Sequence, residues 1–193
     1  MIKTFRRVVT GLNAQGRSVI VSDETMTDAY ERPEWPGCGV TSAWSAGAVP
    51  VDNTTMPKAI AGFPVANGVS LMIMEIAPES ELDAMSPEQR ARALEPVARG
   101  FPQAIEIDTS KSPAMHATDT MDMLIMLQGE LVAIVDDGEV TLKPFDVLIQ
   151  RGVNHGWINR SDKPAIIAAT VIDAKSFDRG DRAGTRTYKP HDQ

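Results

Sequence analysis

Two of the three histidines lie in the β-rich part of the chain, and a carboxylate follows the first of them. His116 and Asp122 are six positions apart, an even spacing, so a strand running through both places their side chains on one face. That face continues through apolar residues at positions 124 and 126, which indicates that it points into a protein interior. The pattern predicts that His116 and Asp122 share an interior, with Thr118 and Thr120 between them and Asp119 pointing outward.

His155 begins a second β-like segment, in which Trp157 and Asn159 occupy the same face. A barrel that brings the two segments together would surround a pocket with two imidazoles and one carboxylate. Such a group could hold a divalent metal ion with coordination positions left open. It could instead work without metal, as a histidine base oriented by Asp122, or consist of buried side chains satisfied by hydrogen bonds. The third histidine, His191, is near the C-terminus and is expected to be solvated.

The elements that would position these residues are short strands separated by turn sequences. An Asp-Gly turn at residues 137–138 lies between two apolar runs and is a strong hairpin signal. Many short strands at regular spacing predict an all-β sandwich or closed roll. The expected strands are Met121–Leu127, Leu131–Val135, Val140–Leu142, Val147–Gln150, His155–Ile158 and Ala165–Ile172.

The first half of the chain has a different pattern. A hairpin is expected over residues 5–22, and strands are expected over Val69–Ile76 and residues 103–108. A short helix is expected near 87–95, because Ser86 can cap its start and Pro96 limits its end. Residues 23–68 are rich in Pro, Gly and Asp and are the least readable. We therefore expect an N-terminal extension over 1–109 whose strands join or flank a barrel core over 110–175. A polar tail follows over 176–193.

The two segments around the histidines resemble the two conserved motifs of the cupin superfamily, over about 65 residues. The first motif reads His-x-His, three or four residues, Glu, six residues, Gly, and the segment from His116 to Glu130 resembles it. The second reads Gly, five residues, Pro-x-Gly, two residues, His, three residues, Asn, and Phe145–Asn159 is similar to it. The resemblance implies a cupin double-stranded β-helix, or jelly-roll barrel, of the RmlC-like kind.

The chain departs from both motifs. Thr118 stands at the second histidine, Asp122 at the glutamate, Phe145 at the opening glycine and Arg151 at the proline. The resemblance therefore implies at most three protein ligands for a divalent Fe, Mn, Ni or Zn ion: His116, Asp122 and His155. Arg151, at the lip of the second motif, could clamp a carboxylate or phenolate, or could be a surface arginine.

Cupins that this chain resembles include dioxygenases, decarboxylases and isomerases, so we expect a metal-dependent enzyme that acts on a small organic or aromatic acid. The alternatives are a metal-free epimerase or lyase with a histidine base, and a non-catalytic binding barrel. A homodimer is expected as well, because exchanged N-terminal strands would cover an exposed sheet edge.

Bulk properties limit the partners and the compartment. The formal net charge is −7, which disfavours binding to nucleic acid and to anionic membranes. Cys38 is the one cysteine, so no intramolecular disulfide forms, and it lies between two glycines in a turn without an activating neighbour. The N-terminus does not read as a signal peptide, and no apolar run is long enough to span a membrane. Together these features predict a cytoplasmic protein.

Overall fold

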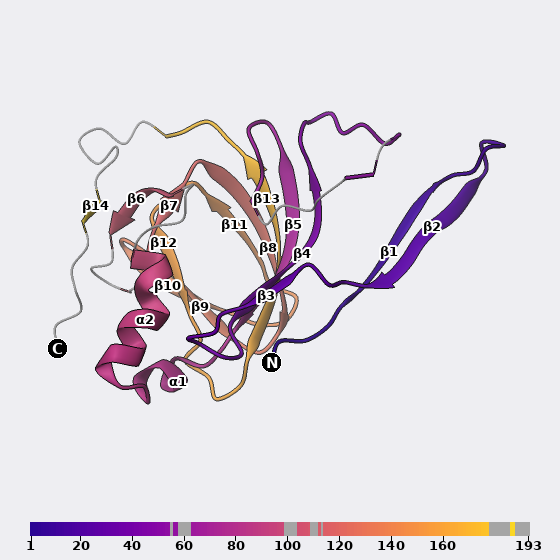
Figure 1. Cartoon of the computed structure of the whole chain (residues 1–193). Coiled ribbons are helices and arrows are strands. Elements are labelled where there is room, and N and C mark those ends of the chain that lie inside the picture. The colour runs from indigo at the N-terminus through magenta and orange to yellow at the C-terminus, as the bar shows by residue number, and fades with distance from the viewer. Residues whose placement is uncertain are drawn as a thin grey trace.

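The computed structural model describes residues 1–54, 56–57, 63–98, 104–108, 112, 114–177 and 186–187. The largest sheet of the protein has six antiparallel strands and curves around the interior, as Figure 1 shows. Three strands from the N-terminal half and three from the C-terminal half lie side by side in this sheet, where β5 pairs with β13, so the predicted extension and the predicted core share one hydrogen-bonded layer. In spatial order the strands are β11 (Val147–Arg151), β8 (Thr120–Gln128), β13 (Ala165–Asp173), β5 (Val69–Ile76), β4 (Gly39–Ala46) and β3 (Ala29–Glu31).

The opposite layer consists of two smaller sheets that meet at the histidines. One contains β10 (Gly138–Leu142), β9 (Leu131–Val135) and β12 (His155–Ile158). The other contains β14 (Arg186–Thr187), β6 (Ala104–Asp108) and β7 (Ala117–Thr118). An isolated antiparallel bridge between His116 and His155 joins them. The all-β, two-layer architecture predicted from the sequence is therefore confirmed.

The core fills the space between the layers because inward residues alternate along each strand. In β8 the side chains of Asp122, Leu124 and Met126 are buried, whereas Ile125 and Leu127 are exposed. Leu124 and Met126 pack with Leu131 of the opposite layer in one apolar cluster. Burying each such side chain contributes about 2 kcal/mol, which fixes the register of the strands that hold the site.

The predicted continuous strand from His116 through Asp122 is wrong, because the chain bends at Asp119. Thr118 belongs to β7 and Thr120 begins β8 in the other layer. The hydroxyl oxygens of these two threonines are 2.7 Å apart and both side chains are buried, so the inward face continues across the bend. Asp119 is half-buried at the bend, where its carbonyl accepts a hydrogen bond from the amide of Ala174.

The predicted N-terminal hairpin forms an arm that extends away from the barrel (Figure 1). It consists of β1 (Arg6–Leu12) and β2 (Ser18–Thr25), paired in antiparallel register. Its large apolar side chains at positions 8, 12, 20 and 21 are exposed. The base of the arm is attached to the barrel, since Arg7 donates a hydrogen bond to the carbonyl of Ala43.

Two helices, α1 (Glu79–Asp83) and α2 (Pro87–Ala98), flank one end of the barrel. The expected cap is present: the Ser86 hydroxyl accepts from the amide of Gln89, whose side chain accepts from the amide of Ser86. The helix continues past Pro96, which we expected to limit it. Neither helix has the length and apolar character needed to cross a bilayer. Most of the predicted tail over 176–193, including His191, lies outside the described residues.

Candidate functional site

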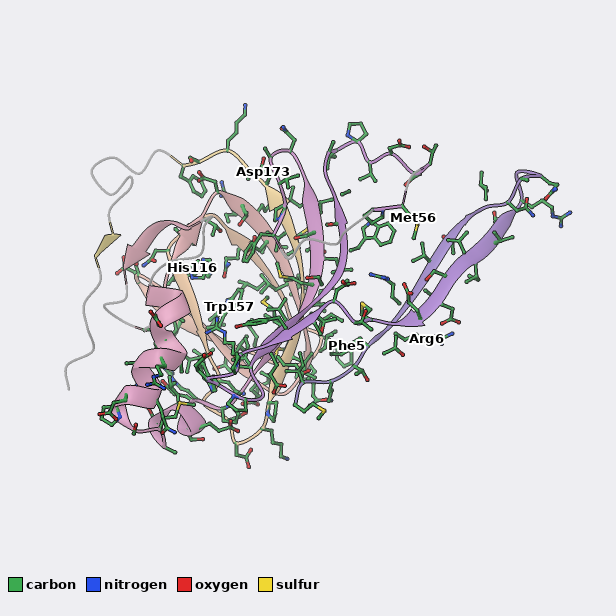
Figure 2. All side chains as sticks on the ribbon, viewed as in Figure 1. Phe5, Arg6, Met56, His116, Trp157 and Asp173 are labelled. Atoms are coloured by element: carbon green, nitrogen blue, oxygen red, sulfur yellow. The ribbon has the colours of Figure 1, made fainter. Side chains whose placement is uncertain are left out.

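A cavity of about 650 Å³ opens in the interior of the barrel. Strands β4, β5, β12 and β13 contribute to its walls, together with the loop between β3 and β4 and the segment before β7. Most of its lining is apolar, and Figure 2 shows His116 and Trp157 lying among the strands that surround it. The apolar lining includes Val40, Phe63, Met72, Met74, Ala169 and Val171.

His116 and His155 form a tightly fixed pair on one wall of this cavity. Each backbone amide donates to the other residue's carbonyl at 2.9 Å, and the ring centroids are 4.6 Å apart. The Nδ1 of His116 is 2.9 Å from the carbonyl of Ala114, and the Nδ1 of His155 is 2.8 Å from the carbonyl of Val153. Because a carbonyl only accepts, each neutral ring carries its proton on Nδ1 and presents Nε2 as an acceptor.

Burial keeps both imidazoles neutral. It lowers the pKa of His116 and, together with the adjacent His116 ring, lowers the pKa of His155 to about 3. His155 is 2% exposed, and its Nε2 finds no hydrogen-bond partner among the residues that the structure describes. Buried acceptors in folded proteins are nearly always paired, so this atom is suited to a bound molecule.

Asp122 lines the same cavity from the facing layer. Its Oδ2 accepts a hydrogen bond of 3.1 Å from Gln150, whose Oε1 accepts one of 3.1 Å from the indole of Trp157. Burial raises the pKa of Asp122, although the hydrogen bonds from Thr120 and Gln150 oppose that shift. Gln150 was not among the residues predicted from the sequence, although the alternation along Val147–Arg151 places it on the inward face opposite Asp122.

The three predicted metal ligands line one cavity but do not converge on one point. Among the described residues, no group of three or more His, Cys, Asp or Glu side chains is arranged to hold a metal ion. Asp122 is instead engaged by Gln150. The side chains therefore do not fit the three-ligand centre that the motif resemblance implies, and metal binding stays a prediction.

The structure does not bring Arg151 to the cavity. It lies on the outer face of β11, is exposed, and its guanidinium stacks over the ring of Phe177 at 4.8 Å. Asn159 is also absent from the cavity lining, because its amide donates to the carbonyls of Ile76 and Lys163 and fixes a turn. Cys38 lines the cavity, but burial raises the pKa of its thiol, which disfavours the reactive thiolate.

Comparison with known proteins assigns most of the second half of the chain to a known family. Residues 104–172 match the family model of the Cupin domain. "Phomopsin biosynthesis cluster protein C'" of Diaporthe leptostromiformis is 40% identical over 58 residues, 30% of this chain and 31% of that protein. "Oryzines biosynthesis cluster protein J" of Aspergillus oryzae is 46% identical over 65 residues, 33% and 36% of the two chains. The chain thus spans about a third of the length of these curated relatives.

A longer match covers 88% of this chain and 74% of the "Cupin-domain-containing oxidoreductase srdB" of Neurospora crassa, at 25% identity. Among solved structures, a Klebsiella pneumoniae protein with a double-stranded β-helix domain is 14% identical, with a TM-score of 0.41. That alignment covers 75% of this chain and 84% of the Klebsiella chain. The family match and the two-motif, two-layer architecture together confirm the expected jelly roll: this chain contains a domain of the cupin superfamily.

Proposed function

We propose that the chain binds a small organic molecule with a largely apolar body inside the barrel, and that His155 accepts a hydrogen bond from it. One observation carries this proposal. The Nε2 of His155 is buried at the cavity wall, unprotonated and without a partner among the described residues. A hydroxyl or N–H group of a bound molecule would satisfy it and would recover the free energy lost by leaving it unpaired.

The rest of the cavity supports the same interpretation. Its volume is within the range of about 300–1,000 Å³ typical of small-molecule sites. Methionine and valine side chains offer an adaptable apolar wall, and the ring of Trp157 lies 5.5 Å from that of His155. Gln150 holds both Trp157 and Asp122, so the polar groups around a ligand are fixed before it binds.

The chemistry of His155 favours binding over proton abstraction. A general base works best when its pKa is near the operating pH. A histidine with a pKa of about 3 is a weak base at neutral pH, so the donated proton stays on the ligand. Of the functions predicted from the sequence, the metal-free binding barrel therefore agrees best with the geometry. The metal-dependent enzyme and the histidine-base enzyme remain predictions.

A displacement assay tests the proposal. N-phenyl-1-naphthylamine is a neutral dye whose fluorescence rises in apolar sites, and we expect saturable binding to the protein. We then compare displacement by 2-naphthol with that by 2-methoxynaphthalene, which lacks the hydroxyl proton. One hydrogen bond of about 1.4 kcal/mol predicts that 2-naphthol displaces the dye about tenfold better.

His155→Asn tests whether His155 is the acceptor. An asparagine amide can still donate to the carbonyl of Val153, but it leaves no acceptor where Nε2 lies. We expect this variant to bind the dye and to lose the preference for 2-naphthol. Arg151→Gln, on the outside of the barrel, is the control and should keep it. Absence of saturable dye binding, or equal displacement by the two compounds with the wild-type protein, would contradict the proposal.

A further inference from the structure

The loop between β3 and β4 brings a positive charge to the cavity. Arg32 lies in this loop, and it is the one Lys or Arg among the described residues that line the cavity. Its side chain is half-buried. No side-chain hydrogen bond or ion pair connects its guanidinium to any residue in the described part of the chain. A half-buried cation without a counter-ion favours binding of an anion.

The loop that carries Arg32 has a defined backbone. The amide of Arg32 donates to the carbonyl of Cys38 at 2.9 Å, and the amide of Cys38 donates to the carbonyl of Trp35 at 3.1 Å. The carboxylate of Glu31 accepts from the amide of Gly37 at 2.8 Å, where a φ of +79° favours glycine. The loop therefore positions its side chains before any ligand arrives.

Trp35 adds a second donor from the same loop. It lines the cavity, and its Nε1 is buried without a hydrogen-bond partner within the described ranges. An indole N–H can only donate, and so can a guanidinium. Two unpartnered donors on one short loop favour an acceptor-rich group on the ligand, and a carboxylate has two oxygens with several lone pairs.

Each acidic residue that lines the cavity already has a partner for at least one carboxylate oxygen. Asp28 is 4.0 Å from the guanidinium of Arg7, and the carboxylate of Glu75 accepts a hydrogen bond from the amide of Lys3. The Oδ2 of Asp122 accepts from Gln150, whereas its Oδ1 is buried without a partner among the described residues. Arg32 is therefore available to a ligand, and these carboxylates do not compete for it in the structure.

We propose that Arg32 and Trp35 bind the carboxylate of the cavity's ligand, which makes the ligand a carboxylic acid with an apolar body. This inference rests on the proposed function and names its ligand class. The planar guanidinium can donate two parallel hydrogen bonds to a carboxylate, and the Trp35 indole can donate a third. The apolar remainder of the acid would then contact the methionine and valine wall of the cavity.

The test uses matched competitors for the bound neutral dye. 3-Phenylpropanoate and 3-phenylpropanamide have the same body, and only the first is charged at neutral pH. We expect the acid to displace N-phenyl-1-naphthylamine at least tenfold better than the amide. Arg32→Gln should reduce this preference to less than about twofold, and Trp35→Phe should reduce it about threefold to fivefold. The preference is the ratio of the two displacement constants measured on the same variant, so a change in that variant's affinity for the dye does not alter it.

Arg151→Gln is the matched control, because it removes the same charge from the outer face of the barrel. It should leave the preference for the acid unchanged. Dye binding with equal displacement by acid and amide would overturn the inference and leave the proposed function intact, whereas absence of dye binding would contradict the proposed function itself. An acid preference that Arg32→Gln and Arg151→Gln lower equally would reflect overall charge and would also overturn the inference.

Discussion

The burial of a neutral histidine predicts that the barrel loses stability in mild acid. The pKa of His155 is about 3 in the folded protein, whereas the ordinary value is 6.5. Between these values the unfolded chain binds a proton that the folded chain does not bind. The stability that the neutral His155 contributes is therefore fully present above pH 6.5 and is lost as the pH falls towards 3.

The size of the effect follows from the two pKa values. Lowering the pH from about 7.5 to about 5 protonates the unfolded histidine but not the folded one, which reduces the free energy of unfolding by about 2 kcal/mol. His116 adds to the loss in the same direction, because burial lowers its pKa too. Above about pH 5 most carboxylates stay ionised in both states, so the histidines dominate this window.

Urea unfolding followed by circular dichroism at the two pH values measures the loss, with EDTA present to exclude metal binding. Over the same pH interval, the free energy of unfolding of His155→Asn should fall by about 2 kcal/mol less than that of the wild-type protein. Nitrogen-15 chemical shifts of the His155 ring should show the Nδ1–H form at both pH values. Equal losses for the wild-type protein and the variant, or a His155 ring that titrates near pH 6.5, would refute the reasoning.

Three further predictions follow from the same geometry. Asn159→Ala leaves two part-buried backbone carbonyls without their donors, so urea unfolding should show that the free energy of unfolding falls by about 3 kcal/mol. Two imidazoles without a third protein ligand hold divalent metals weakly, so elemental analysis should find well below one equivalent of Fe, Mn, Ni or Zn. Near-stoichiometric metal that disappears in a His116→Ala, His155→Ala variant would instead support the predicted metal centre. The exposed apolar side chains of the arm favour the predicted homodimer, so light scattering should give twice the chain mass, and Leu12→Lys with Ile20→Lys should give a monomer. A wild-type monomer would contradict this.

The alternation of residues along a strand predicted the inward positions well, because it is a property of the backbone. His116, Asp122 and His155 line one cavity, as this alternation suggests. The bend at Asp119 was not predicted, because it arises where the chain passes from one layer to the other, and local residue preferences do not specify that passage.

The donors of the cavity were harder to predict than the histidines. Arg151 was chosen from its place in a motif, but Gln150 is the inward residue of that strand, and the alternation alone could have shown it. Arg32 and Trp35 lie in a loop whose sequence gives no periodic signal, and they reach the cavity only because β3 and β4 pair at the edge of the large sheet. Such tertiary placement is not encoded in a local pattern.

The bridge between His116 and His155 also has a consequence for hydrogen exchange. It is an isolated rung, held by two reciprocal backbone hydrogen bonds of 2.9 Å rather than by a continuous ladder. Breaking it would separate the two small sheets at one seam while the six-stranded sheet stays paired. Local opening of this kind costs less free energy than global unfolding. Such opening would expose the amides of His116 and His155 to solvent exchange together, ahead of the amides of the six-stranded sheet.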